Sequence, residues 1–294
     1  MTMRYLLIAL TVLLVSCQPP ASQRSADEKP IITVTIEPQR YFAEAIAGDN
    51  FQIVSMVPKG SNPESYDPTP QQLVNLEKSS AYLRIGYIGF EQSWMERISS
   101  NIAHLREFDT SKGIDFIKDS CHHHHGNHTH HEGIEPHVWT STTNALIIAK
   151  NTYAAIRSLD ENNKKFYFER YDSLCNAIMQ TDHAIREIFA NDSISKSFMI
   201  YHPALSYFAR DYGLNQYAIE DNGKEPSPSY LKKLIVLGKK EQIGVIFVQP
   251  EFDKRNAEVI AQETGARIIP INPLNYNWRE ELLHIARQLV VSPK

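Results

Sequence analysis

The sequence predicts an α/β protein of two pseudo-repeated lobes, each with a mostly parallel sheet and flanking helices, joined by one long rigid helix. Two observations favour this fold. Buried-strand patterns and helical patterns alternate along residues 31–85, and the same order of elements recurs along residues 197–271. A length of 294 residues agrees with two domains, each large enough for its own core. A cleft between the lobes is the expected place for a ligand.

In the first half, residues 31–36, 51–57 and 81–85 have the composition of strands, and residues 41–47 and 71–77 that of helices. Glu37-Pro38 is expected to end the first strand. The segment from Lys59 to Pro70 holds three prolines and a glycine. Such a composition predicts a rigid loop.

Two helices are expected in the middle of the chain. The first covers residues 142–159, with Ser141 or Thr142 as its N-cap. The second covers residues 164–190, with apolar residues at spacings of three and four and no glycine or proline. At ~1.5 Å per residue it would be about 40 Å long, more than one lobe needs. It therefore reads as the helix that links the lobes.

The second half resembles the first. Strands are expected at 197–201, 245–248 and 267–271, and helices at 254–264 and 279–290. His202-Pro203 follows its strand as Glu37-Pro38 follows the first one, and residues 224–231 resemble residues 66–73. Pseudo-repetition explains these echoes, although chance similarity of two α/β halves is an alternative.

The N-terminus has the features of a secreted lipoprotein. Arg4 precedes an apolar run, residues 5–15, that is too short to span a bilayer comfortably. Leu14 to Cys17 resembles the bacterial lipobox, so Cys17 is expected to carry a lipid. The predicted organisation is a signal peptide (1–16), a lipidated flexible tether (17–30), a first lobe (31–163), the linking helix (164–190) and a second lobe (191–294). Cys121 and Cys175 are not expected to pair.

Histidines are concentrated in one stretch. Residues 121–141 hold eight of the twelve histidines, seven of them in a polar loop, residues 121–132. Neutral imidazole is a common ligand of zinc, so the loop from His122 to His131 is interpreted as a metal collector. His137 differs, because Pro136 and Trp139 place it in a stiff segment before a helix. A solvated insert or an expression tag are the alternatives for the loop.

Four residues are candidate metal ligands: Glu64, His137, His202 and Asn272. His202 and Asn272 directly follow predicted strands, and Glu64 lies in the loop after the second strand. Ligands of doubly wound sheets gather at the carboxyl ends of strands. Separately, Glu64 could be a solvated loop acid and His202 a histidine at a helix N-terminus. The coincidence of four such positions favours one metal site in the cleft.

From residue 31 to 290 the chain resembles the metal-binding solute receptors of zinc and manganese ABC transporters. The motifs that carry the resemblance are Gly60-x-Asn62-Pro63-x-x-Tyr66-x-Pro68-Thr69-Pro70, Glu135-Pro136-His137-Val138-Trp139, His202 before residues 207–213, residues 223–228, and residues 257–265 with Asn272-Pro273-Leu274. The resemblance implies metal ligands at positions 64, 137 and 202, and its zinc-selective branch carries a His-rich insert. It further implies a permease of an ABC importer as partner and an extracytoplasmic, membrane-anchored monomer.

Two departures from the family pattern bear on the metal. Glu64 stands where the family usually has a histidine, and Asn272 stands where many members have an aspartate. A carboxylate can still bind zinc. The expected site is Glu64, His137 and His202, with Asn272 or water fourth. The hard Glu64 ligand favours manganese or iron(II), while the loss of the aspartate and the His-rich loop favour zinc.

Other function classes fit less well. A net charge of −4 argues against a nucleic-acid partner. A zinc-dependent hydrolase would also use Glu and His ligands with an open position, but the sequence has no HExxH or GxSxG motif. The chain is therefore not expected to be an enzyme. A manganese or iron(II) receptor and a metal-binding adhesin of the same fold are the alternatives to a zinc receptor.

Overall fold

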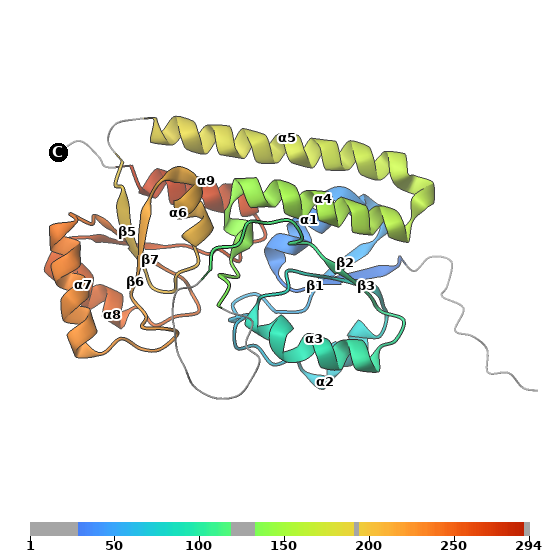
Figure 1. The fold of residues 1–294 in the computed structure, drawn as a ribbon, viewed down its shortest axis with the longest axis horizontal. Helices are drawn as coiled ribbons and strands as arrows, with labels where there is room; N and C mark the ends of the chain where they lie inside the picture. Colours follow the sequence, from blue (N-terminus) through green and yellow to red (C-terminus); the bar gives the residue numbers. More distant parts are fainter. Residues whose placement is uncertain (1–28, 119–132, 191–193, 291–294) are drawn as a thin grey trace, which may run out of the picture.

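The computed structural model of the chain describes residues 29–118, 133–190 and 194–290. Figure 1 shows two lobes side by side, with the long helix α5 (Lys164–Phe189) running along both of them. Each described sheet has four parallel strands, in the orders β2-β1-β3-β4 and β6-β5-β7-β8. The matching strand orders confirm the predicted α/β fold of two pseudo-repeated lobes.

The first lobe follows the predicted alternation with shifted boundaries. Its elements are β1 (Ile31–Val34), α1 (Glu37–Ala47), β2 (Gln52–Ser55), α2 (Pro70–Leu76), β3 (Ser79–Arg84), α3 (Gly89–Asn101) and β4 (Arg106–Asp109). β1 ends early because the N–H groups of Thr35 and Ile36 donate to the side chain of Gln39. α1 then begins at Glu37, four residues before the predicted start. Pro38 is tolerated there because proline lacks a backbone N–H, and the first turn of a helix leaves its N–H groups unpaired.

Two elements of this lobe were not predicted. α3 begins at a glycine, has no side-chain cap, and buries the acid Glu91 among its apolar residues. β4 reads Arg-Glu-Phe-Asp and is largely exposed at the sheet edge, so it lacks the apolar pattern of a buried strand. Both elements depend on tertiary packing, which the local residue pattern does not indicate.

The second lobe repeats the arrangement. Its elements are β5 (Ser197–Ile200), α6 (Ser206–Tyr212), β6 (Asn215–Ala218), α7 (Pro228–Lys240), β7 (Val245–Val248), α8 (Arg255–Thr264), β8 (Arg267–Pro270) and α9 (Trp278–Gln288). β5 and β7 are buried along their whole length and were recognisable as strands. β6 is a polar edge strand and was not predicted from the sequence.

Helices α4 (Thr142–Leu159) and α5 connect the lobes, and the Ser141 side chain caps α4 as predicted. α5 has 26 residues, about 39 Å at 1.5 Å per residue, so the predicted long helix is present and ends one residue early. It packs against α1, α4 and α9. None of the helices within the described ranges is long and apolar enough to cross a membrane.

One hydrophobic core runs through both lobes. It includes Phe42 of α1 and Phe208 of α6, and Trp278 of α9 packs edge-on against Phe42 with ring centroids 5.3 Å apart. The last helix thus returns from the second lobe to the first. A smaller second cluster lies around β7, α7 and α8, and Ile246 and Ile260 are among its fully buried members. The lobes are therefore packed together as well as connected in sequence.

Candidate metal centre

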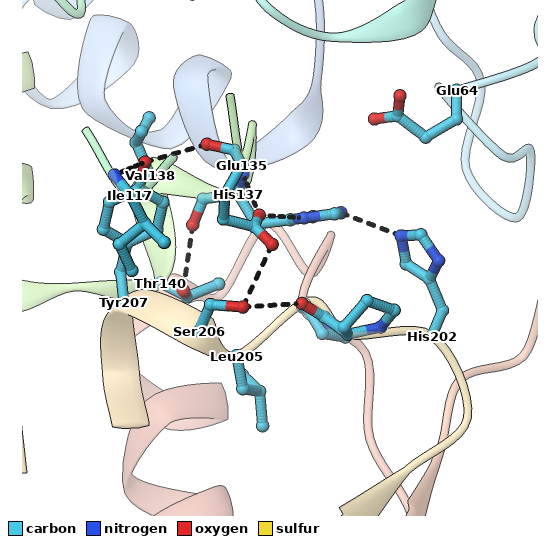
Figure 2. Close-up of polar contacts among 12 residues, drawn as sticks. Glu64, Ile117, Glu135, His137, Val138, Thr140, His202, Leu205, Ser206 and Tyr207 are labelled. Carbon is cyan, nitrogen blue, oxygen red and sulfur yellow. Dashed lines mark hydrogen bonds and ion pairs between the residues drawn. The ribbon is translucent and has the colours of Figure 1, made fainter. Parts of the chain in front are cut away.

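The centre of the candidate site is a pair of histidines contributed by the two lobes. His137 lies just before the short helix η2 (Val138–Thr140), and His202 follows β5. The two Nε2 atoms are 3.2 Å apart (Figure 2). His137 is 6% exposed, and His202 is partly buried with its ring stacked on Phe252. The structure thus brings together two of the four predicted ligands.

Each imidazole is held on its other nitrogen by a carboxylate. Nδ1 of His137 lies 2.5 Å from Oε1 of Glu135, and Nδ1 of His202 lies 3.0 Å from Oε2 of Glu220. A carboxylate accepts a hydrogen bond, so Nδ1 carries the proton in the neutral ring. Both Nε2 lone pairs then face one another, an arrangement that a bound cation stabilises.

The spacing of the two nitrogens suits a tetrahedral metal. Zinc–nitrogen bonds of 2.0–2.1 Å at a tetrahedral angle place two ligand nitrogens about 3.3 Å apart. The observed 3.2 Å between Nε2 of His137 and Nε2 of His202 is close to that value. The pair is therefore preorganised to act as two ligands of one ion.

Glu135 ties the first histidine to both lobes. Its Oε1 also accepts from the backbone N–H of His137 at 2.8 Å, and its Oε2 accepts from Oγ of Ser206 in the second lobe at 3.0 Å. The Tyr207 hydroxyl donates to the carbonyl of Glu135 at 2.8 Å. Burial alone would raise the pKa of Glu135, but the charge and hydrogen bonds of His137 outweigh it and lower that pKa.

The pKa of His137 shifts in the complementary direction. Burial alone would lower the pKa of the imidazole, but the charge and hydrogen bond of Glu135 raise it above its ordinary value. Glu64 and Glu220 add to the rise through their charges. The pocket therefore presents negative charge to whatever binds between the histidines, as a site for a cation requires.

Glu64 approaches the pair from the loop after β2. Figure 2 shows its carboxylate apart from the two imidazoles, with no hydrogen bond or ion pair drawn to either. Oε2 of Glu64 accepts from the N–H of Gly89, the first residue of α3, at 3.0 Å. Oε1 of Glu64 is buried and has no hydrogen-bond partner. One oxygen thus anchors the side chain on a helix N-terminus while the other remains available to a ligand.

Close packing fixes this loop on α3. The N–H of Phe90 donates to the carbonyl of Pro63 at 2.9 Å. A Cβ added to Gly89 would lie 2.3 Å from the carbonyl oxygen of Glu64, so only glycine permits the approach. The three prolines of the loop and this contact together position Glu64.

Asn272 is held by local hydrogen bonds at the end of β8. Its Oδ1 accepts from the N–H of Leu274 at 3.0 Å, and its own N–H donates to Glu281 at 2.7 Å. It lines a neighbouring cavity of about 80 Å³ together with Lys59. Asn272 is not among the residues that line the cavity of the two histidines.

A second cavity, of about 20 Å³, is lined by both histidines, with room for about one water-sized particle. Two residues that were not among the predicted ligands, Gln249 and Glu251, also line it, and both follow β7. Gln249 clamps the backbone of His202 through bonds of 2.7 and 3.3 Å. The sequence could have indicated Gln249 and Glu251 only through their position directly after a predicted strand.

Within the described residues, no three His, Cys, Asp or Glu side chains lie close enough together to hold an ion at once. The histidine pair is therefore formed in advance, and a carboxylate must move toward it to complete a site. The predicted lipid attachment at Cys17, Cys121 and the histidines from His122 to His131 fall outside the described residues. Cys175, on α5, is the one cysteine within the described ranges, so whether it pairs with Cys121 stays a prediction.

Comparison with known proteins places the chain in a family. A family model described as zinc-uptake complex component A, periplasmic, matches residues 32–286. The high-affinity zinc uptake system protein ZnuA of Bacillus subtilis is 27% identical over 288 residues, which cover 94% of this chain and 89% of the relative. The manganese ABC transporter substrate-binding lipoprotein PsaA of Streptococcus mitis is 25% identical over 278 residues, covering 91% of this chain and 86% of the relative.

The fold agrees with a solved relative. A crystal structure of ZnuA superposes with a TM-score of 0.82 at 31% identity, over 89% of this chain and 98% of that one. The family match extends from β1 to α9 and includes Glu64, His137 and His202. The chain belongs to the family of periplasmic A components of zinc-uptake complexes.

Proposed function

We propose that this protein is an extracytoplasmic zinc receptor that binds the ion in the cleft between its lobes and delivers it to the permease of an ABC importer. The histidine pair carries the proposal. Two imidazoles from different lobes meet at 3.2 Å between Nε2 atoms, and each is held in one tautomer by a carboxylate. Carboxylate–histidine pairs of this kind are a recurrent support of protein-bound zinc.

In this proposal His137, His202 and Glu64 are the ligands, with the fourth position open to Asn272 or water. Reorientation of Glu64 costs few hydrogen bonds, because Oε1 has no partner to give up and Oε2 has a single one. Carboxylate oxygens bind zinc at about 2.0–2.2 Å. As a member of a family of uptake components, the protein binds its ion as cargo and is not an enzyme.

Manganese is the second candidate cargo, with iron(II) beside it. Manganese prefers oxygen ligands to imidazole. The proposed ligand set has the carboxylate of Glu64 at the position where the family usually has a histidine, which is a softer ligand. The similarity to a manganese-binding lipoprotein agrees with that alternative. The tetrahedral spacing of the two histidine nitrogens and the match to the zinc-uptake family support zinc.

The wider organisation forms part of the proposal. We retain residues 1–16 as signal peptide and residues 17–30 as the tether, with a lipid on Cys17 that holds a monomeric receptor at the membrane. The lobes are residues 31–163 and 191–294, linked by residues 164–190, and α9 of the second lobe packs back on α1. The loop from His122 to His131 is proposed to collect metal for the cleft.

A competitive metal titration tests the proposal. Zinc and manganese affinities are measured for the protein, for a variant lacking residues 122–131, for Glu64→Ala and for His202→Ala. We expect one tight zinc ion that survives loop deletion and is weakened at least about a hundredfold in His202→Ala. If deletion of residues 122–131 by itself abolished tight binding, the metal would be assigned to the loop instead. Tighter binding of manganese than of zinc would select the second candidate.

A further inference from the structure

Glu251 is a carboxylate in the histidine cavity that the ligand set above does not use. It follows β7, at the same sheet edge at which His202 follows β5. It lines the cavity of about 20 Å³ together with His137 and His202. Its position is that of a ligand contributed by a third strand end.

The polar atoms of Glu251 are unusual within the described part of the chain. Only two buried side-chain oxygens there have no hydrogen-bond partner, and they are Oε1 of Glu64 and Oε1 of Glu251. Both belong to residues beside the histidine pair. Buried carboxylate oxygens without partners are costly, so two of them at one place call for a common explanation.

The electrostatics agree with the geometry. Burial raises the pKa of the Glu251 carboxyl above its usual range, and its own backbone N–H and the nearby His202 offset part of the rise. Besides Glu135 and Glu220, which bond to the two imidazoles, Glu64 and Glu251 add two carboxylates whose charge a divalent cation would offset. Binding of the ion would therefore satisfy both oxygens together.

Asn272 is a weaker candidate for the same position. Its Oδ1 already accepts a hydrogen bond of 3.0 Å from Leu274, which would be lost on coordination. It is uncharged, and it lines the neighbouring cavity rather than the one that contains the histidines. The sequence offered Asn272 because of its place after a strand, and Glu251 has an equivalent place.

We infer that Glu251 is the fourth metal ligand, which completes a set of Glu64, His137, His202 and Glu251 around one divalent ion. This inference rests on the proposed function, since it concerns the same ion. It also explains how a chain with asparagine at position 272 keeps an anionic fourth ligand. Two carboxylates and two imidazoles form a four-coordinate set that zinc accepts.

The test is a zinc competition titration of the purified protein and four single variants. Glu251→Gln removes the charge with little change of shape, and Asn272→Ala removes the competing side chain. His137→Ala tests the proposed function itself, and Glu96→Gln, at an exposed position of α3, is the matched control. All variants are first melted without metal, to establish that they are folded.

We expect Glu251→Gln to weaken zinc binding by about ten- to a hundredfold or more, with Asn272→Ala and Glu96→Gln within about twofold of the wild type. Unchanged affinity in Glu251→Gln, or an equal loss in Asn272→Ala, would overturn the inference. Unchanged affinity in His137→Ala would instead overturn the proposed function. If Glu251→Gln does not fold, Glu251→Asp withdraws the carboxylate by one methylene and should weaken binding in the same direction.

A Co²⁺ spectrum supplies an independent measurement. Four-coordinate Co²⁺ absorbs visible light much more strongly than five- or six-coordinate Co²⁺. We expect intense bands in the wild type and in Asn272→Ala, and weaker, shifted bands in Glu251→Gln. Identical spectra for Glu251→Gln and the wild type would count against direct coordination by Glu251.

Discussion

The indole Nε1 of Trp278 donates a 2.6 Å hydrogen bond to the backbone carbonyl of Trp139, two residues after His137. Nε1 of Trp139 in turn donates to the carbonyl of Pro273 at 2.8 Å. Both indoles are buried. The start of the last helix is thus bonded directly to the segment that carries His137.

Trp278→Phe should therefore destabilise the whole protein. The substitution leaves the buried carbonyl of Trp139 without its donor, which costs about 1–3 kcal/mol. Denaturant unfolding measures the change. Trp94→Phe is the matched control, because Nε1 of Trp94 donates to Asp67 in an exposed setting and its loss should cost clearly less. Equal effects of the two substitutions would contradict the structural role given to Trp278.

The carboxylate partner of His202 should matter for metal affinity although it does not touch the ion. Glu220→Gln weakens the acceptor that fixes the Nδ1 proton, so we expect about tenfold weaker zinc binding. The surface pair of His183 and Glu187 offers a control of the same chemistry away from the site. Glu187→Gln should leave the affinity unchanged, and a loss there equal to that of Glu220→Gln would refute the specific effect.

The contact between α3 and the Glu64 loop should tolerate no side chain. Gly89→Ala places a Cβ against the carbonyl of Glu64, so we expect a loss of about 1–3 kcal/mol of stability together with weaker zinc binding. Gly244→Ala is the control, since no atom lies within 4 Å of the added Cβ and the backbone φ is not in the left-handed region. Wild-type zinc affinity in Gly89→Ala would show that the loop can shift without moving Glu64.

The buried acid of α3 should make stability depend on pH. Burial raises the pKa of Glu91 to about 7, against hydrogen bonds from Thr35 and the backbone of Ile85 and Gly86 that oppose the rise. The folded protein therefore keeps a proton that the unfolded chain releases from about pH 4.5 upward. From Glu91 alone, the free energy of unfolding should fall by on the order of 3 kcal/mol between pH 4.5 and 7.

Unfolding of the metal-free protein at a series of pH values measures this dependence. Glu91→Gln, which cannot ionise, should flatten the curve in that window, whereas Glu96→Gln on the same helix should not. A wild-type curve that stays level or rises from pH 4.5 to 7, with no difference from Glu91→Gln, would contradict the raised pKa.

Much of the fold could be predicted because the inner strands are recognisable from their sequence. Residues 31–34 and 245–248 are buried on both faces, so apolar, β-branched composition alone identifies them. The edge strands β4 and β6 are polar, because one side of each lies at the sheet margin. Their place is set by pairing with β3 and β5, which a local pattern does not record.

Some residues of the candidate site could likewise be recognised from the sequence, and others are brought to it only by the fold. His137 and His202 stand out from the sequence by residue type and by their neighbours, and Glu135 was visible two positions before His137. Glu220 was not, because β6 brings it to His202 only through the sheet. Glu251 was missed because an acid after a strand is common, and only its unpartnered buried oxygen distinguishes it.

The return of α9 to the first lobe has a consequence for how fast an ion leaves. The lobes are connected by α5 and again by the packing of Trp278 on Phe42 and its hydrogen bond to Trp139, so wide separation would break the common core. Release of an ion from the proposed site would then require movement of the small elements around the histidine pair, above all the loop that carries Glu64. If Glu64 is a ligand as proposed, the residence time of the ion would depend on movement of this loop, and an importer that displaces the loop would control release.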